Sequence, residues 1–101
     1  MKYNKLVRDK IPEIIKNEGK APLTHIANGE EYKKKLYEKL SEETQEFLNN
    51  PSKEEIADIL EVIDSICELN KINKNDLELI KNQKLIKKGS FKNRIILDEV
   101  R

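Results

Sequence analysis

The 101-residue sequence has few of the residues that mark several classes of protein. Its single cysteine, Cys67, excludes an internal disulfide, so we expect a reducing, cytoplasmic environment. No apolar run approaches the ~20 residues that span a bilayer, and no apolar stretch like that of a signal peptide follows the basic N-terminus. We therefore expect a cytoplasmic protein with no membrane partner.

Hydrophobic residues are also scarce. They make up 37% of the chain, below the ~45–50% of ordinary globular domains, and only five residues are aromatic, none of them Trp. A small domain buries a smaller share of its surface than a large one. We therefore expect an aliphatic core that is completed by self-association, as a homodimer or a higher homo-oligomer.

The net charge of +1 conceals a pattern along the chain. Residues 1–20 carry a net +3, residues 30–64 a net −6 and residues 65–101 a net +4. A polybasic nucleic-acid arm or an acidic tail would have one dominant sign, so we expect no nucleic-acid partner. Composition alone favours a solvated helix surface for the acidic middle, and only the direction in which its acids point tells more.

Helical signals dominate the sequence, and no repeat or linker divides it, so we predict a single domain over residues 1–101. We predict a short helix from about Pro12 to Asn17, followed by three helices that end near Asn49, Leu69 and Lys88. The N-cap is Asn28 for the first of these three, Asn50 or Ser52 for the second and Asn75 for the third, which Gly89 ends. Residues 22–27 and 93–98 have extended character, and a minor two-stranded β element formed from them is left open. The predicted fold class is all-α, a helical bundle that contains an antiparallel helix hairpin.

Glu43 is the most informative residue, because it lies inside the apolar stripe of the helix that ends near Asn49. On a helical wheel that stripe is formed by Tyr32, Leu36, Leu40 and Phe47. Burying a carboxylate is costly unless it is paired or bound to a cation. One alternative is that a buried Lys or Arg holds Glu43.

The next helix contains two Glu-x-x-Asp pairs, and residues three apart share a helix face. Glu55 and Asp58 lean toward the packed side, whereas Glu61 and Asp64 point toward solvent. Two antiparallel helices would bring Glu55 and Asp58 close to Glu43 and to Glu46, which lies at the edge of its stripe. Alternatively, Glu55 serves only as the capping partner of Ser52, and Glu46 pairs with a surface Lys. Four converging oxygen donors without His or Cys favour Mg²⁺, with Mn²⁺ as a substitute.

The pattern Glu42-Glu43-Thr44-Gln45-Glu46 followed by Glu55-Ile56-Ala57-Asp58 resembles the signature of the all-α nucleoside triphosphate pyrophosphohydrolases, the MazG-like and phosphoribosyl-ATP pyrophosphohydrolase-like superfamily. The opening segment 3–15 and the closing segment 87–97 are similar to a small house-cleaning branch that is predicted to hydrolyse non-canonical nucleotides. Only eight residues separate Glu46 from Glu55, fewer than in longer MazG proteins. The hairpin must therefore be tight, which leaves less protein surface to line a pocket for the nucleotide base.

The resemblance implies a MazG-like fold and an enzyme that cleaves between the α- and β-phosphates of a nucleoside triphosphate, releasing the monophosphate and pyrophosphate. It implies that Mg²⁺ is bound by Glu43, Glu46, Glu55 and Asp58, which are then also the catalytic residues. A metal must reverse the local charge, because four carboxylates would otherwise repel a triphosphate. Basic residues of the two flanks are hypothesised to contact the substrate phosphates: Lys5, Arg8, Lys10, Lys88 and Arg94.

A non-catalytic helical dimerisation or interaction module, such as a regulator or the partner of a toxin, is the alternative function on the same fold. For Arg8, which Asp9 follows, a structural ion pair is an equal alternative to a phosphate contact. Lys residues of the flanks serve solubility in the simplest interpretation. His25 and Cys67 are expected to be structural, because neither has a nucleophile–base partner in the sequence.

Overall fold

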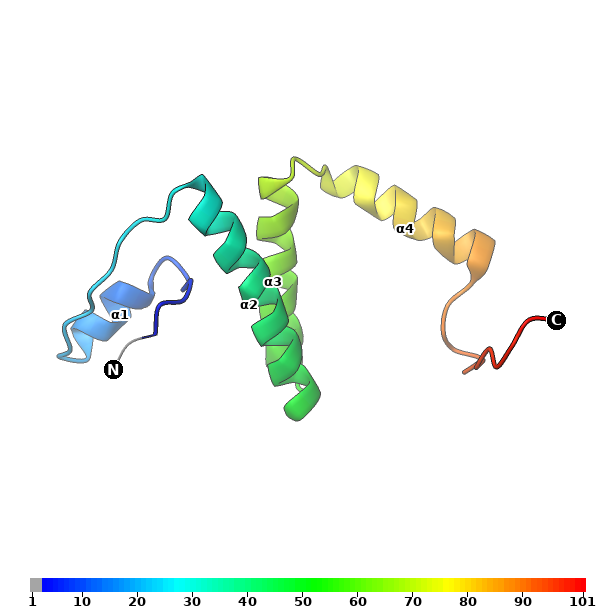
Figure 1. Ribbon diagram of the computed structural model, residues 1–101, viewed down its shortest axis with the longest axis horizontal. Helices are drawn as coiled ribbons and strands as arrows, with labels where there is room; N and C mark the ends of the chain where they lie inside the picture. The colour runs from blue at the N-terminus through cyan, green and yellow to red at the C-terminus, as the bar shows by residue number, and fades with distance from the viewer. Residues whose placement is uncertain (1–2) are drawn as a thin grey trace. The chain divides into compact units, whose positions relative to one another are not determined.

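The computed structural model describes residues 3–101 and is all-helical over them, with no strand. Its four helices are α1 (Ile11–Asn17), α2 (Gly29–Asn49), α3 (Lys53–Leu69) and α4 (Lys74–Lys88), shown in Figure 1. None of these helices is long and apolar enough to cross a membrane. The contacts divide the chain into two compact units, one that ends at Asn70 and one that begins at Lys71.

The first unit is built around the hairpin of α2 and α3, which pack side by side (Figure 1). The Asn28 side chain accepts a hydrogen bond from the Glu31 backbone N–H at the start of α2. Ser52 does the same for the Glu55 backbone N–H at the start of α3. Only residues 50–52 connect the two helices, so α3 must run back along α2. The predicted antiparallel hairpin is confirmed.

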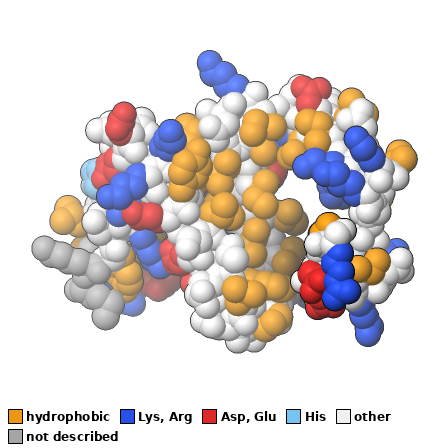
Figure 2. Space-filling model, turned by 45° about the vertical axis from the view of Figure 1, so that its right-hand side comes forward, with side chains coloured by type: hydrophobic (Ala, Val, Ile, Leu, Met, Phe, Trp, Pro, Cys, Tyr) orange, Lys and Arg blue, Asp and Glu red, His pale blue; other side chains and the backbone are white. Residues whose placement is uncertain are grey.

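The core of the hairpin is small. Its buried hydrophobic side chains are Leu36 of α2 with Val62 and Cys67 of α3. Cys67 is thus a small core residue, as expected. Several other apolar side chains of the two helices are half-buried, and some stay exposed, Leu60 at 55%. Hydrophobic side chains form a band along the middle of the view in Figure 2.

The second unit consists of α4 and the segment that follows it, and every residue from 71 to 101 is exposed. The cap of α4 differs from the prediction. Asn73, not Asn75, caps the helix, because the Asn73 side chain accepts hydrogen bonds from the backbone N–H groups of Asn75 and Asp76. Gly89 ends α4 with φ of 85°, a conformation that costs glycine little, as predicted.

The β element that the sequence left open is not formed within residues 3–101. Segments 22–27 and 93–98 lie outside all regular structure. A strand persists only where a neighbouring strand satisfies its backbone N–H and C=O groups, and neither segment has such a ladder. In the first segment Pro22 also lacks the N–H that a ladder needs. Whether the chain forms the single domain 1–101 stays a prediction.

Candidate metal centre

The acidic residues of the two motifs lie near the closed end of the hairpin. Glu46 is in the last turn of α2, and Glu43 lies about one turn earlier. Glu55 is in the first turn of α3, and Asp58 lies about one turn later. The three-residue connection therefore brings together carboxylates that a longer loop would not hold in register. The N-cap bond from Glu55 to Ser52 fixes the start of α3, and with it the position of Glu55.

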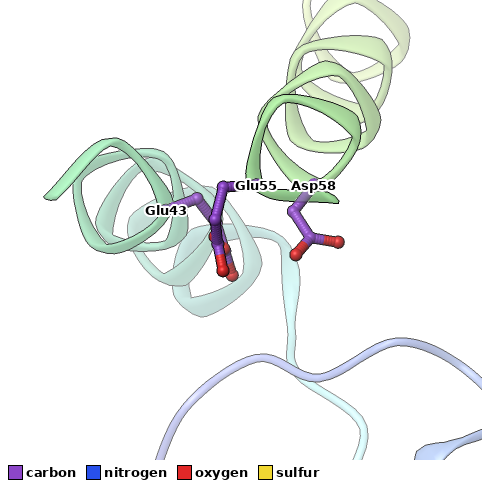
Figure 3. Close-up of side chains that lie close together, drawn as sticks. All are labelled: Glu43, Glu55 and Asp58. Carbon is purple, nitrogen blue, oxygen red and sulfur yellow. The ribbon is translucent and has the colours of Figure 1, made fainter. Parts of the chain in front are cut away.

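Three of these residues form a tight group. Glu43, Glu55 and Asp58 each offer one carboxylate oxygen, and the three oxygens all lie within 4.8 Å of one another. Figure 3 shows Glu43 approaching from α2 and the other two from α3, with the carboxylates of Glu43 and Glu55 side by side. Glu43 is buried, with only 6% of its surface exposed, whereas Glu55 and Asp58 are half-buried. The convergence inferred from the helical wheel is thus present for these three residues.

Two oxygens of this group are buried without a hydrogen-bond partner among the described residues: Oε2 of Glu43 and Oε2 of Glu55. The other oxygen of Glu43, Oε1, lies 3.4 Å from Nζ of Lys39, one turn earlier on α2. The alternative in which a Lys holds Glu43 is therefore present, but for one oxygen only. A buried carboxylate oxygen without a partner is costly, so a proton or a cation at this point would stabilise the fold.

The crowding of carboxylates changes their affinity for protons. The neighbouring Glu43 carboxyl raises the pKa of Glu46 above its usual value, first through a shared hydrogen bond and then through its negative charge. Desolvation raises the pKa of Glu55, and the charge of Glu46 adds to it. Glu46 therefore lies close to the group of three, although it is exposed and is not one of the three. Both raised pKa values mean that these two carboxyl groups hold a proton more firmly than free glutamate does.

The chemistry of this donor set fits a hard divalent cation. All the donors are carboxylate oxygens, which Mg²⁺ and Mn²⁺ prefer, and no His or Cys takes part. Oxygens that share an ion of this size at 2.0–2.1 Å lie within about 4.2 Å of one another, so three oxygens that lie within 4.8 Å need at most a small shift to share one. Glu43, Glu55 and Asp58 are therefore the residues that would hold it, with Glu46 at their side.

The basic residues proposed from the sequence are not all placed at this group. Lys5 pairs with Glu42 at 3.1 Å and Arg8 with Asp58 at 2.7 Å. Lys10 lies at the N-terminal end of α1 and makes no ion pair with a described residue. Lys88 and Arg94 belong to the second unit, where they line an open pocket of about 410 Å³ together with residues such as Phe91.

The sequence interpretation left open that a Lys holds Glu43 without naming Lys39, and it missed two contacts of the N-terminal segment. Lys39 was detectable, because a Lys four residues before a Glu on one helix face is in reach of it. The pairs from Lys5 to Glu42 and from Arg8 to Asp58 join residues 37 and 50 positions apart, and no local pattern marks such pairs.

Comparison with known proteins adds no relative: no family model, no curated protein and no solved structure matches this chain.

Proposed function

We propose that this protein is a Mg²⁺-dependent nucleoside triphosphate pyrophosphohydrolase, which hydrolyses the α–β phosphate bond of a non-canonical nucleotide. The observation that carries the proposal is the pair of buried oxygens without hydrogen-bond partners on Glu43 and Glu55, next to the carboxylate of Asp58. A helix interface gains nothing from such oxygens, whereas a metal site requires them. The resemblance of the two acidic motifs to this superfamily supplies the reaction.

The residues divide the work between metal and substrate. Glu43, Glu55 and Asp58 would hold Mg²⁺, with Glu46 as the fourth predicted ligand. When bound, Mg²⁺ would neutralise charge on the phosphates and help to orient the attacking water. The negative charge of the carboxylates would attract the ion. Arg8 contacts Asp58 of this group, and Lys5 contacts Glu42, the residue before Glu43, so both cations are available to phosphate oxygens. Mn²⁺ is the expected substitute.

The proposal is tested by pyrophosphate release over a panel of canonical and non-canonical nucleoside triphosphates with Mg²⁺. We expect turnover of at least one nucleotide by the wild type, with the monophosphate as second product. Glu55→Gln removes one charged ligand without changing side-chain size, so we expect a loss of at least about 100-fold in turnover. Mg²⁺ should also raise the melting temperature of the wild type more than that of this variant.

Glu61→Gln is the matched control. It makes the same change on the same helix, but Glu61 is exposed and lies outside the group of three. We expect its turnover to stay within about 2-fold of the wild type, in keeping with the small effects of surface substitutions. No turnover of any nucleotide, together with no stabilisation by Mg²⁺ or Mn²⁺, contradicts the proposal.

A non-catalytic interaction module is the second candidate function. It is favoured by the exposed apolar side chains of the hairpin, among them Leu48, Ile56 and Leu60. Exposed apolar side chains of this kind form a docking surface when a partner covers them. The hydrolysis assay separates the two candidates, because only the enzyme requires Glu55.

A further inference from the structure

The N-terminal segment, residues 3–10, lies across the acidic side of the hairpin. Lys5 binds Glu42 of α2, and Arg8 binds Asp58 of α3. Lys35 of α2 donates a hydrogen bond to the backbone oxygen of Asn4 at 2.8 Å. In Figure 3 the blue ribbon of this segment runs on the side toward which the carboxylates point. Two cationic side chains of this segment thus each contact a carboxylate, one on α2 and one on α3.

The contact of Arg8 is with one of the three residues that would hold the metal. Nη2 of Arg8 lies 2.7 Å from Oδ1 of Asp58. The pair is open to solvent, with 57% of the Arg8 side chain and 38% of the Asp58 side chain exposed. Exposed pairs of this kind contribute little to stability, so the pair separates readily when either partner finds a better one.

We propose that Arg8 is an exchangeable counter-ion: it neutralises Asp58 in the metal-free protein, yields that carboxylate to the divalent cation, and then binds the phosphates of the substrate. The inference rests on the proposed function and deepens it, because it assigns the order in which one side chain serves the metal site and the substrate. It reconciles the two alternatives for Arg8, an ion pair and a phosphate contact, as successive states of the same residue.

The charges of the site favour this exchange. A divalent cation that enters between Glu43, Glu55 and Asp58 is repelled by a guanidinium already bound to one of them. Once the cation has taken the carboxylate, Arg8 is a flexible cation next to a bound metal, where a triphosphate brings new anionic oxygens. Guanidinium binds phosphate through two parallel N–H groups, a better partner than the single Asp58 oxygen it now contacts.

A different role for Arg8 makes the opposite prediction. If Arg8 stays on Oδ1 and only orients Asp58 for the metal, its removal weakens metal binding, as the loss of outer partners of metal ligands commonly does. The sign of the change in metal affinity therefore distinguishes an exchangeable counter-ion from a fixed support.

The test is a pair of calorimetric titrations on metal-free protein, first with Mn²⁺ and then with inorganic pyrophosphate in saturating Mn²⁺. For Arg8→Ala we expect Mn²⁺ to bind about 2- to 5-fold more tightly than to the wild type, because a weak exposed competitor is gone. We expect pyrophosphate to bind about 10-fold or more weakly, because a charge-assisted contact is lost. A merely structural role would not shift the two affinities in opposite directions.

Two further variants complete the experiment. Lys16→Ala removes one positive charge from the neighbouring helix α1, but Lys16 is exposed and makes no ion pair with a described residue, so both affinities should stay within about 2-fold of the wild type. Arg8→Lys keeps the charge and loses the planar fork. It should bind Mn²⁺ like the wild type and pyrophosphate with an affinity between those of wild type and Arg8→Ala.

Opposite shifts in Arg8→Ala support the exchange. Unchanged or weaker Mn²⁺ binding in Arg8→Ala, with a wild type that binds Mn²⁺, overturns the exchange and leaves the proposed function standing. Equal shifts in Lys16→Ala also overturn it, because the effect would then come from net charge alone. A wild type that binds no Mn²⁺ overturns the metal centre itself, and the exchange with it.

Discussion

Glu43 combines two requirements that seldom meet in one residue. Glu43 is buried because it lies on the packed side of α2, and a buried carboxylate is unfavourable unless it has a hydrogen-bond partner or a cation. Lys39 provides a partner for one oxygen, since a Lys and a Glu four residues apart lie on the same face. The other oxygen is buried without a hydrogen-bond partner among the described residues, in a side chain that lies close to Glu55 and Asp58 of α3. The charge of Glu43 therefore destabilises the folded state until a proton or a cation compensates it.

Glu46 gives this cost a pH dependence. Its pKa is raised above the usual 4.5, so the folded protein holds the proton more firmly than the unfolded chain does. The contribution to stability is therefore present below about pH 4.5 and is lost as the pH rises through the raised pKa. Glu46→Gln removes this dependence. Without metal, the variant should therefore be more stable than the wild type at neutral pH, and this advantage should become smaller as the pH falls. Urea unfolding between about pH 4 and 8 measures the difference.

Glu61→Gln again provides the control, because Glu61 is exposed and outside the group of three. Its stability relative to the wild type should not vary with pH. Addition of Mg²⁺ at neutral pH should stabilise the wild type more than Glu46→Gln, since a cation offsets the same repulsion. A stability advantage of Glu46→Gln that grows toward low pH would contradict the assignment.

At the scale of single residues, helical periodicity was sufficient to predict that Glu43, Glu55 and Asp58 lie close together. A wheel states which face a side chain occupies, and a short turn then determines which faces meet. The partner of Asp58 was not predictable in the same way. Arg8 is 50 positions away in a segment with no regular structure, and its placement depends on tertiary contacts such as that of Lys35 with Asn4.

At the scale of elements, the start of α3 couples folding to the site. Ser52 accepts a hydrogen bond from the Glu55 backbone N–H at 3.2 Å, and Glu55 carries one of the two buried oxygens without a partner. We expect Ser52→Ala to lower the free energy of unfolding by about 1 kcal/mol, the usual value of an N-cap. Chemical denaturation measures this loss. Because the first turn of α3 then frays, the affinity for Mn²⁺ should fall as well.

Ser41→Ala is the control for this change. Ser41 lies within α2 and is exposed, and Ala has the higher helix propensity there, so its stability should equal or slightly exceed that of the wild type. Equal stability of Ser52→Ala and Ser41→Ala would show that the cap does not support α3.

Helices were predictable because their signals are local. The 3.6-residue period, the caps and the glycine after α4 all lie within a few residues of what they determine. The cap of α4 shows the limit of this reasoning, because Asn73 and Asn75 are both good caps and only backbone geometry chooses between them. Strand character in segments 22–27 and 93–98 was not enough, because a strand requires a partner that propensity does not specify.

At the scale of the whole molecule, the described residues bury few apolar side chains. Leu36, Val62 and Cys67 are the buried hydrophobic residues of the described chain, and α4 buries none. Two helices alone seldom provide enough burial to offset the conformational entropy lost on folding. We expect further burial to come from another surface, in keeping with the low hydrophobic content of the sequence.

We therefore expect a homodimer in which two copies cover the exposed apolar face of the hairpin. Ile56 and Leu60 share this face of α3, one turn apart, and Leu60 is 55% exposed. Sedimentation equilibrium should give twice the chain mass of 11.8 kDa for the wild type. Leu60→Lys places a charge on this face, so the dimer should dissociate, and unfolding should become easier because association stabilises the fold. Glu61→Lys introduces the same residue on the polar side of α3, so this variant should stay dimeric. A wild type that is monomeric at every concentration would contradict the dimer. Equal dissociation of the dimer in both variants would show that the two copies do not meet at this face.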